Sequence, residues 1–291
     1  MTTHLREPAF DYLPSWTNAK GHWFTRADGS RLRYVVTGDG PPLVLMHTVR
    51  TQLDYFQRVI PLLTGSYRVY AVDFPGMGWS DIQPGAHYDH ADLQAAIVEF
   101  VRGLDLTDVT LAGESMGATI ALTGSVELGE RVTRVVASNT YDYPQGLERA
   151  NLLARVIVSS VRAPIIGPTF ASLENKPIVR GIMGGGYADP SRLPASFLDE
   201  LMRVGKRPGY SRVARAVYRN LPTLIAARST YPAITAPVTL IYSDKDWSRS
   251  ADRKATAAAI PTATVREIDN AGHFSALEKP HAFADALLSP R

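Results

Sequence analysis

Long apolar runs recur along the chain and are separated by more polar stretches. Two short runs near the start, GHWFTRA (21–27) and RLRYVVT (31–37), flank Asp28-Gly29, a dipeptide typical of a β-hairpin turn. The continuous apolar runs further along are typical of strands buried on both faces of a parallel sheet. We predict such strands at 42–47, 67–73, 108–113, 131–138 and 237–243, and a less apolar one at 263–269.

Segments with helical spacing of apolar residues alternate with these strands. The spacing is clearest in 51–64 and in 90–103, where Asp89 is placed to cap the helix. This alternation predicts an α/β fold, in which a mostly parallel central sheet has right-handed crossovers and is flanked by helices. Further helices are predicted directly after Ser115, at 249–259 and at 280–289.

The alternation stops near residue 140 and resumes near residue 236. Between these points, helix-like stretches are repeatedly interrupted by proline, and no buried strand is evident. We therefore predict a first core part at 1–140, a helical cap inserted after the sixth strand at 141–235, and a second core part at 236–291. Residues 1–20 have the pattern of an irregular arm.

Composition indicates an ordinary globular protein. Hydrophobic residues make up 45% and charged residues 20% of the 291 residues, and the net charge of +3 does not indicate a nucleic-acid partner. The absence of cysteine excludes disulfides, thiol nucleophiles and thiolate metal centres. The first residues lack the pattern of a secretory signal, and no run approaches 18 uncharged apolar residues. We therefore expect a cytoplasmic protein without a transmembrane segment.

Positive charge is concentrated in the cap. Residues 141–235 hold 13 Lys and Arg against 6 Asp and Glu. The simplest interpretation is a set of solvated helix faces. The alternative is that this charge steers an anionic substrate or a membrane surface towards the cap.

The stretch LAGESMGATIAL (111–122) places Ser115 between a predicted buried strand and a predicted helix. In such a tight turn the flanking positions need glycine, here Gly113 and Gly117, because a Cβ would clash. The serine would lie at the carboxyl end of its strand, where α/β proteins bind ligands, and near helix amides that favour negative charge. Ser115 is therefore a candidate nucleophile.

A serine nucleophile needs a base and an orienting carboxylate. Of the seven histidines, His273 is the best candidate base, because it lies in a loop between the last strand and the last helix. A metal site at HYDH (87–90) lacks partner ligands at the usual spacing, so we predict no metal. The loop SDKDW offers Asp244 and Asp246, and of these we favour Asp246, with the other capping the next turn.

At this point the chain resembles the α/β-hydrolase superfamily, in particular its esterase, haloperoxidase-like and epoxide-hydrolase-like group with a helical cap. The resemblance covers nearly all of residues 21–290. GESMG resembles the nucleophile elbow, VDFPGMGWSD (72–81) the D-x-P-G-x-G-x-S block, LIYSDKDW the acid loop and AGHFSALEKP the histidine loop. The resemblance implies a catalytic triad in the order Ser115, Asp246 and His273.

The resemblance also implies an oxyanion hole made of two backbone N–H groups. One would belong to Met116 and the other to Val49, with Thr48 as the alternative donor. Here the sequence departs from the family, because Thr48 stands where a glycine normally follows His47. Arg50 is either a contact for a substrate carboxylate or phosphate, or a surface residue paired with Asp54. The remaining candidate substrate contacts are His47, Thr48, Glu114, Trp247 and Phe274.

The expected activity is hydrolysis of a small-molecule carboxylic ester, lactone or thioester through an acyl-enzyme intermediate, without a cofactor. Haloalkane dehalogenases and epoxide hydrolases of this fold, which the chain resembles, use aspartate where Ser115 stands. This difference argues against their chemistry here. The alternatives are a carbon–carbon bond hydrolase of the meta-cleavage type, a perhydrolase or cofactor-free haloperoxidase, and a non-catalytic binding protein. The glycine cluster in GIMGGGYADP (181–190) lacks the features of a phosphate loop and is expected to be a flexible cap loop.

Overall fold

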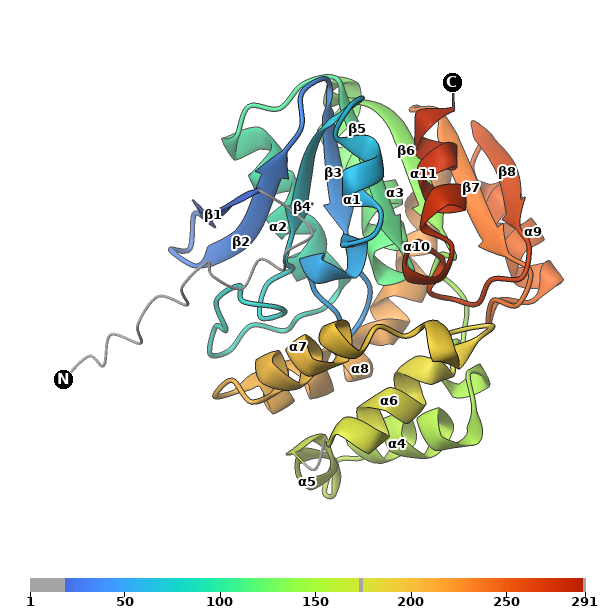
Figure 1. The fold of residues 1–291 in the computed structure, drawn as a ribbon. Coiled ribbons are helices and arrows are strands. Elements are labelled where there is room, and N and C mark those ends of the chain that lie inside the picture. Colours follow the sequence, from blue (N-terminus) through green and yellow to red (C-terminus); the bar gives the residue numbers. More distant parts are fainter. Residues whose placement is uncertain (1–18, 173–174, 290–291) are drawn as a thin grey trace.

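The structure is a computed structural model and describes residues 19–172 and 175–289. Eight strands form one sheet in the order β1-β2-β4-β3-β5-β6-β7-β8 (Figure 1). The pairs β1–β2 and β2–β4 are antiparallel, and all other neighbours are parallel. The arm predicted for 1–20 falls almost entirely outside the described residues. The strands are β1 (Lys20–Thr25), β2 (Arg31–Thr37), β3 (Pro42–Met46), β4 (Arg68–Val72), β5 (Val109–Glu114), β6 (Val132–Ser138), β7 (Val238–Ser243) and β8 (Ala263–Ile268).

Helices cover both faces of this sheet. In Figure 1, α1 and α11 lie in front of the strands, and α2 and α3 lie behind them. Strands β5 and β7 are buried along their whole length, as their unbroken apolar runs predicted. Asp89 caps α2 by accepting a hydrogen bond from the N–H of Asp92. The helices are α1 (Ile60–Leu63), α2 (His90–Gly103), α3 (Met116–Leu128), α9 (Ser250–Ala259), α10 (Ser275–Glu278) and α11 (Pro280–Leu288).

The single long helix predicted for 51–64 is wrong. The segment forms a short 3-10 helix, η2 (Leu53–Phe56), followed by the one-turn helix α1. The N–H of Leu53 donates to the buried carboxylate of Asp73 at 2.7 Å, outside the segment. Pro61 has no N–H to give to the carbonyl of Gln57, so a continuous helix cannot pass through this point.

The D-x-P-G-x-G-x-S block is held by a buried ion pair. Asp73 accepts from Arg33 at 2.6 Å, from the N–H of Leu53 at 2.7 Å and from the N–H of Trp79 at 2.8 Å. Gly78 has a φ of +51°, and a Cβ there would overlap the Asp73 carboxylate. The block therefore connects β2 and β4 to the loop after β3 and has a structural role.

The described part of the segment between β6 and β7 contains helices joined by turns and loops, and no strand. It contains α4 (Leu152–Arg162), α5 (Gly167–Ser172), α6 (Lys176–Gly184), α7 (Ala195–Gly205) and α8 (Tyr210–Ala227). Short 3-10 turns complete the fold, namely η3 (Gly129–Arg131), η4 (Leu147–Arg149), η5 (Pro190–Arg192) and η6 (Arg228–Ala233). These cap helices lie across the carboxyl ends of the central strands (Figure 1). The α/β architecture with a helical cap after the sixth strand is thus confirmed, while the exact bounds 141 and 235 stay a prediction.

Among the described residues, none of the helices is both long enough and apolar enough to cross a lipid bilayer.

Candidate active site

Ser115 sits at the turn from β5 into α3 with an unusual backbone conformation. Its φ is +59° and its side chain is almost fully buried. A Cβ on Gly117 would overlap the carbonyls of Met46 and His47, and one on Gly113 would overlap the backbone of Gly117. The two glycines therefore allow the end of β3 to pass close to this turn, and the strained conformation projects the serine hydroxyl from it.

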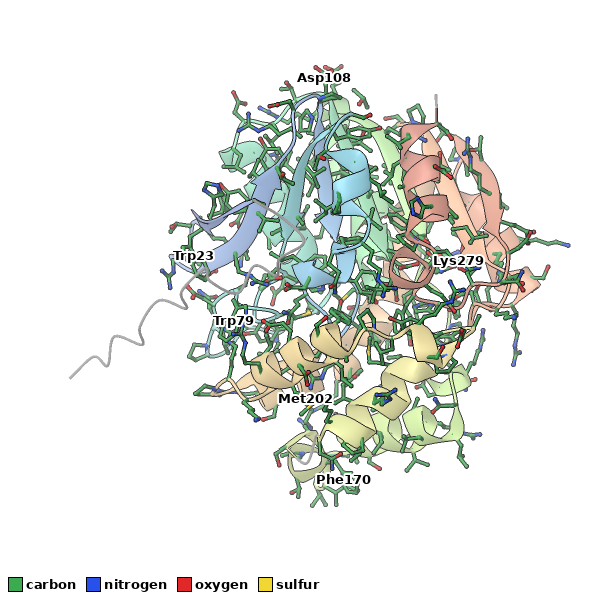
Figure 2. The ribbon with its side chains drawn as sticks, viewed as in Figure 1. Trp23, Trp79, Asp108, Phe170, Met202 and Lys279 are labelled. Atoms are coloured by element: carbon green, nitrogen blue, oxygen red, sulfur yellow. The ribbon has the colours of Figure 1, made fainter. Side chains whose placement is uncertain are left out.

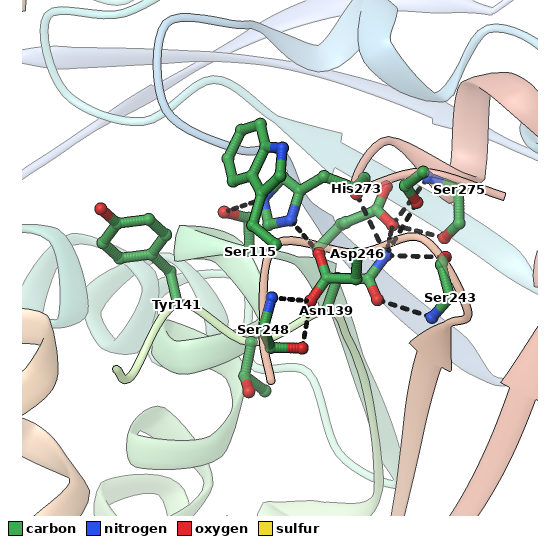
Figure 3. Close-up of polar contacts among 12 residues, drawn as sticks. Ser115, Asn139, Tyr141, Ser243, Asp246, Ser248, His273 and Ser275 are labelled. Atoms are coloured by element: carbon green, nitrogen blue, oxygen red, sulfur yellow. Dashed lines mark hydrogen bonds and ion pairs between the residues drawn. The ribbon is translucent and has the colours of Figure 1, made fainter. Parts of the chain in front are cut away.

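The structure brings Ser115, His273 and Asp246 together in one hydrogen-bonded row (Figure 3). His273 Nε2 lies 2.8 Å from Ser115 Oγ, and His273 Nδ1 lies 2.5 Å from Asp246 Oδ1. The histidine and the aspartate are inaccessible to solvent. Trp247 stacks on the His273 ring with centroids 3.7 Å apart, which restrains rotation of the imidazole.

The two aspartates of the acid loop have different surroundings. Asp246 accepts hydrogen bonds from the N–H of Ser248 at 2.9 Å and from the Ser248 hydroxyl. Burial by itself raises the pKa of Asp246, but the charge and hydrogen bond of His273 and the bonds from Ser248 hold this pKa below its ordinary value. Asp244 instead accepts from the N–H of Ala271 at 3.0 Å, so it braces the loop that carries the histidine.

The loop after β3 begins next to the nucleophile turn, where the carbonyl of His47 lies close to Gly117. The N–H of Thr48 donates to the side chain of Thr51 at 3.2 Å, which makes Thr48 a poor second oxyanion donor and favours Val49. The left-handed residue of this loop is Arg50, with a φ of +63°. Met116 opens α3 directly after the serine. The donors Met116 and Val49 remain predictions.

His47 holds this loop in place. Its Nε2 accepts from the N–H of Phe74 at 3.1 Å, and its Nδ1 lies 2.9 Å from the carbonyl of Thr48, to which it donates in the neutral ring. Complete burial lowers the pKa of His47 to about 4, so the ring is neutral near pH 7. The sequence predicts a substrate contact at His47, but both nitrogens are engaged by protein and the side chain is inaccessible.

Glu114 was also a candidate substrate contact, and its position does not suit that role. Its carboxylate is fully buried and accepts hydrogen bonds from several donors on three other segments of the chain. These segments are η2, the end of β6 and the histidine loop. The donors are the hydroxyls of Tyr55, Ser138 and Ser275, the Asn139 amide, and the N–H groups of Ser275 and Ala276. Glu114 therefore joins the nucleophile turn to the loop that carries His273.

Replacing Glu114 with glutamine should destabilise the fold. The amide keeps one acceptor oxygen but adds an NH₂ group that faces buried donors such as the N–H of Ala276. We expect a loss of about 3 kcal/mol in the free energy of unfolding, measured by urea denaturation. Glu127→Gln, on the exposed face of α3, is the matched control and should change stability by less than about 0.5 kcal/mol. Equal midpoints for the two variants would contradict the role given to Glu114.

Asn139 is a site residue that the sequence reasoning missed. It has a φ of +45° just beyond β6, and its amide donates to the carbonyl of His273 at 3.1 Å (Figure 3). Its Oδ1 accepts from the N–H of Ser243 at 2.9 Å. Asn139 therefore joins the carboxyl ends of β6 and β7 to the histidine loop. An asparagine directly after a buried strand, where left-handed backbone is tolerated, was the signal that could have found it.

A narrow pocket with a cavity volume of about 20 Å³ lies between this row and the cap. Trp247 and Phe274, whose rings pack against His273, form its wall on the core side. Arg50 lines both this pocket and a smaller adjoining one, and its guanidinium lies 4.8 Å from the centre of the Tyr210 ring. Arg50 is buried and Asp54 pairs with Arg33, so the expected surface ion pair between Arg50 and Asp54 is wrong. The other lining residues of the larger pocket are Val49, Leu147, Val179, Ile182, Met183 and Tyr218.

The glycine cluster of the cap packs directly on the histidine loop. The carbonyl of Gly186 accepts from the N–H of Phe274 at 3.0 Å, and that of Gly185 accepts from the indole of Trp247 at 3.0 Å. A Cβ on Gly186 would overlap the Phe274 ring. The flexible loop expected from the sequence is therefore a hydrogen-bonded, close-packed contact between cap and core.

Comparisons with known proteins agree with this fold. Residues 38–286 match the model of the alpha/beta hydrolase family. The chain is 27% identical to haloalkane dehalogenase 2 of Mycobacterium tuberculosis, covering 92% of this chain and 94% of that protein. Its fold is similar to the crystal structure of Cfl2 from Burkholderia cenocepacia, with a TM-score of 0.83, 23% identity and coverage of 94% and 96%. It is also similar to the epoxide hydrolase CorEH, with a TM-score of 0.80, 22% identity and coverage of 93% and 97%. The chain therefore belongs to the alpha/beta hydrolase family, and hydrolysis is the activity that this membership supports.

Proposed function

We propose that the protein is a serine hydrolase that cleaves small carboxylic esters through an acyl-enzyme intermediate. The observation that carries the proposal is the row in which Ser115 Oγ lies 2.8 Å from His273 Nε2 and His273 Nδ1 faces Asp246. This is the arrangement of nucleophile, base and orienting acid that acyl transfer to serine requires.

In the proposed acylation step, His273 Nε2 takes the proton of Ser115 as its Oγ attacks the ester carbonyl carbon. The carbonyl oxygen becomes an oxyanion, which the N–H groups of Met116 and Val49 would stabilise. His273 then gives the proton to the leaving alkoxide, and the acyl group stays on Ser115. Water, deprotonated by the same nitrogen, then attacks the acyl carbon. The bond from that carbon to Ser115 Oγ breaks, His273 returns the proton to Oγ, and the acid is released. Asp246 holds the imidazole tautomer and stabilises its charged form.

The identity of the nucleophile argues against the reactions for which the relatives are named. An attacking aspartate forms an ester that water can hydrolyse at the carbonyl carbon. Attack by Ser115 on an alkyl halide or epoxide would instead form an ether, which has no carbonyl for water to attack. We therefore propose acyl transfer in preference to dehalogenation or epoxide opening.

The side chains that line the pocket indicate which class of ester it would favour. Its lining is mostly aliphatic and aromatic, and Arg50 is the one charged side chain among the residues that form it. A short apolar acyl chain that ends in a carboxylate would place its apolar part against Met183 and Phe274 and its charge near Arg50.

Replacing Arg50 with methionine should reduce selectivity for anionic esters. We expect kcat/KM for the p-nitrophenyl monoester of glutaric acid to fall by about 10- to 100-fold, because a charge-assisted hydrogen bond is lost. The value for p-nitrophenyl pentanoate, which has the same chain length without the charge, should change by less than about threefold. Arg212→Met, on an exposed part of the cap, controls for general electrostatic steering. An equal loss for both esters would remove anion recognition from the proposal.

A substrate panel distinguishes ester hydrolysis from the other activities of this fold. Wild-type protein should hydrolyse p-nitrophenyl esters of graded chain length, with lactones and thioesters as further tests of the leaving group. Turnover of a meta-cleavage product without ester turnover would favour the carbon–carbon bond hydrolase, and peracid formation faster than hydrolysis would favour the perhydrolase. A protein that turns over none of these compounds would favour a binding function.

A further inference from the structure

The outer surface of the cap carries a group of exposed apolar side chains. Seven large hydrophobic side chains are exposed among the described residues, and five of them fall between positions 152 and 166. We call these five the cap ridge. They are Leu152, Leu153, Val156, Ile165 and Ile166, with exposed fractions of 76%, 39%, 51%, 90% and 50%.

The cap ridge follows one side of α4 and the turn after it. Leu152 and Val156 are four positions apart and share a face of the helix. Ala154, Val158 and Val161, by contrast, are buried against the rest of the cap. Helix α4 is therefore apolar on both sides, a pattern typical of a helix that is covered on both sides.

The ridge is held rigidly and protrudes. Arg215 donates to the carbonyls of Ala163 at 3.1 Å and Pro164 at 3.4 Å, which fixes the turn that presents Ile165. On the other side, the Leu153 side chain fills the space beside Gly181 of α6. Figure 2 shows Phe170, which follows in α5, at the far end of the cap from the sheet.

Exposed arginines lie next to the ridge. Of the three arginines in residues 149–173, Arg149 pairs with Asp252 and Arg162 pairs with Glu148, so their charges are balanced within the protein. Arg155 is exposed on α4 between ridge positions, and Arg180 is exposed next to Gly181, where Leu153 packs. The cap as a whole holds 13 Lys and Arg against 6 Asp and Glu.

From this combination we propose that the cap ridge docks on an anionic phospholipid surface. Protruding leucine and isoleucine side chains would enter the interfacial region, while Arg155 and Arg180 would pair with lipid phosphates. A second copy of the chain fits the ridge less well, because a symmetric contact between two ridges would bring the arginines of one copy close to those of the other. This docking is independent of the ester chemistry proposed above.

Vesicle flotation of the 291-residue protein tests the proposal. Wild-type protein should float with phosphatidylcholine vesicles that contain about 30% phosphatidylglycerol, and should float much less with pure phosphatidylcholine. Arg155→Gln with Arg180→Gln should lower the partition coefficient by about 25-fold, since each basic residue near such a surface contributes about fivefold. Leu152→Ser with Ile165→Ser should abolish flotation on anionic vesicles even at low salt.

Matched controls lie on strand β8 and beside it, away from the cap. Val265→Ser removes another half-exposed apolar side chain on β8, and Lys254→Gln with Arg266→Gln removes two exposed charges near it. These controls should float like wild type. Failure of wild type to float on anionic vesicles, or equal loss for the controls, would overturn the proposal. Dimers in lipid-free solution that Ile165→Ser dissociates would overturn it too, by showing that the ridge is a contact between copies.

Discussion

Ser115→Ala is expected to remove essentially all ester hydrolysis, lowering kcat by about 10⁴- to 10⁶-fold. Without the hydroxyl, His273 has no proton to take and no acyl-enzyme can form. Alanine has the same Cβ as serine, so the strained φ of +59° is unchanged and the fold should be kept. The measurement is steady-state hydrolysis of a p-nitrophenyl ester by purified protein.

Ser125→Ala is the matched control for this result. Ser125 is buried in the same helix, α3, and donates only to the carbonyl of Leu122 at 2.7 Å. We expect its activity to stay within about twofold of wild type. Residual turnover by Ser115→Ala at more than about a tenth of the wild-type rate would remove Ser115 from the mechanism.

Asp246→Asn is expected to have the second largest effect, a loss of about 10⁴-fold in kcat. The amide cannot stabilise the imidazolium, and an NH₂ group facing Nδ1 favours the tautomer with its proton on Nε2. That tautomer cannot accept the proton of Ser115. Steady-state kinetics at a fixed pH near neutrality measure the effect.

Asp244→Asn, two residues earlier, provides the comparison. Asp244 accepts from the N–H of Ala271, and an asparagine oxygen can accept the same bond. Its kcat should fall by no more than a few fold. If Asp244→Asn lost more activity than Asp246→Asn, the assignment of the orienting acid would be reversed.

The central strands were predictable because they carry continuous apolar runs that a doubly covered strand can bury. β1 and β2 were predicted from the turn signal between them, and β8, the less apolar strand, is largely exposed. The prediction failed at 51–64, where the apolar residues have helical spacing but Pro61 cannot donate a helix hydrogen bond to Gln57. Periodicity counts apolar positions and gives no weight to this break. The bond from the N–H of Leu53 to the buried carboxylate of Asp73, which ties η2 to the core, is a long-range contact that no local pattern reveals.

The candidate site also contains residues that the sequence predicts and residues that it does not. Ser115, Asp246 and His273 could be chosen because each follows a recognisable strand within a motif. The sequence predicts substrate contacts at Glu114 and His47, which adjoin those motifs, but sequence adjacency does not show which way a side chain points. Asn139 belongs to no motif, and its role depends on β6 and β7 being neighbours in the sheet.

The proposed nucleophile can be observed directly by treating wild-type protein with a fluorophosphonate and measuring its intact mass and peptides. The predicted result is one covalent adduct, located on Ser115, which is absent from Ser115→Ala and unaffected in Ser125→Ala. An adduct on another residue, or an unmodified wild-type protein under conditions that label other serine hydrolases, would contradict the proposed mechanism.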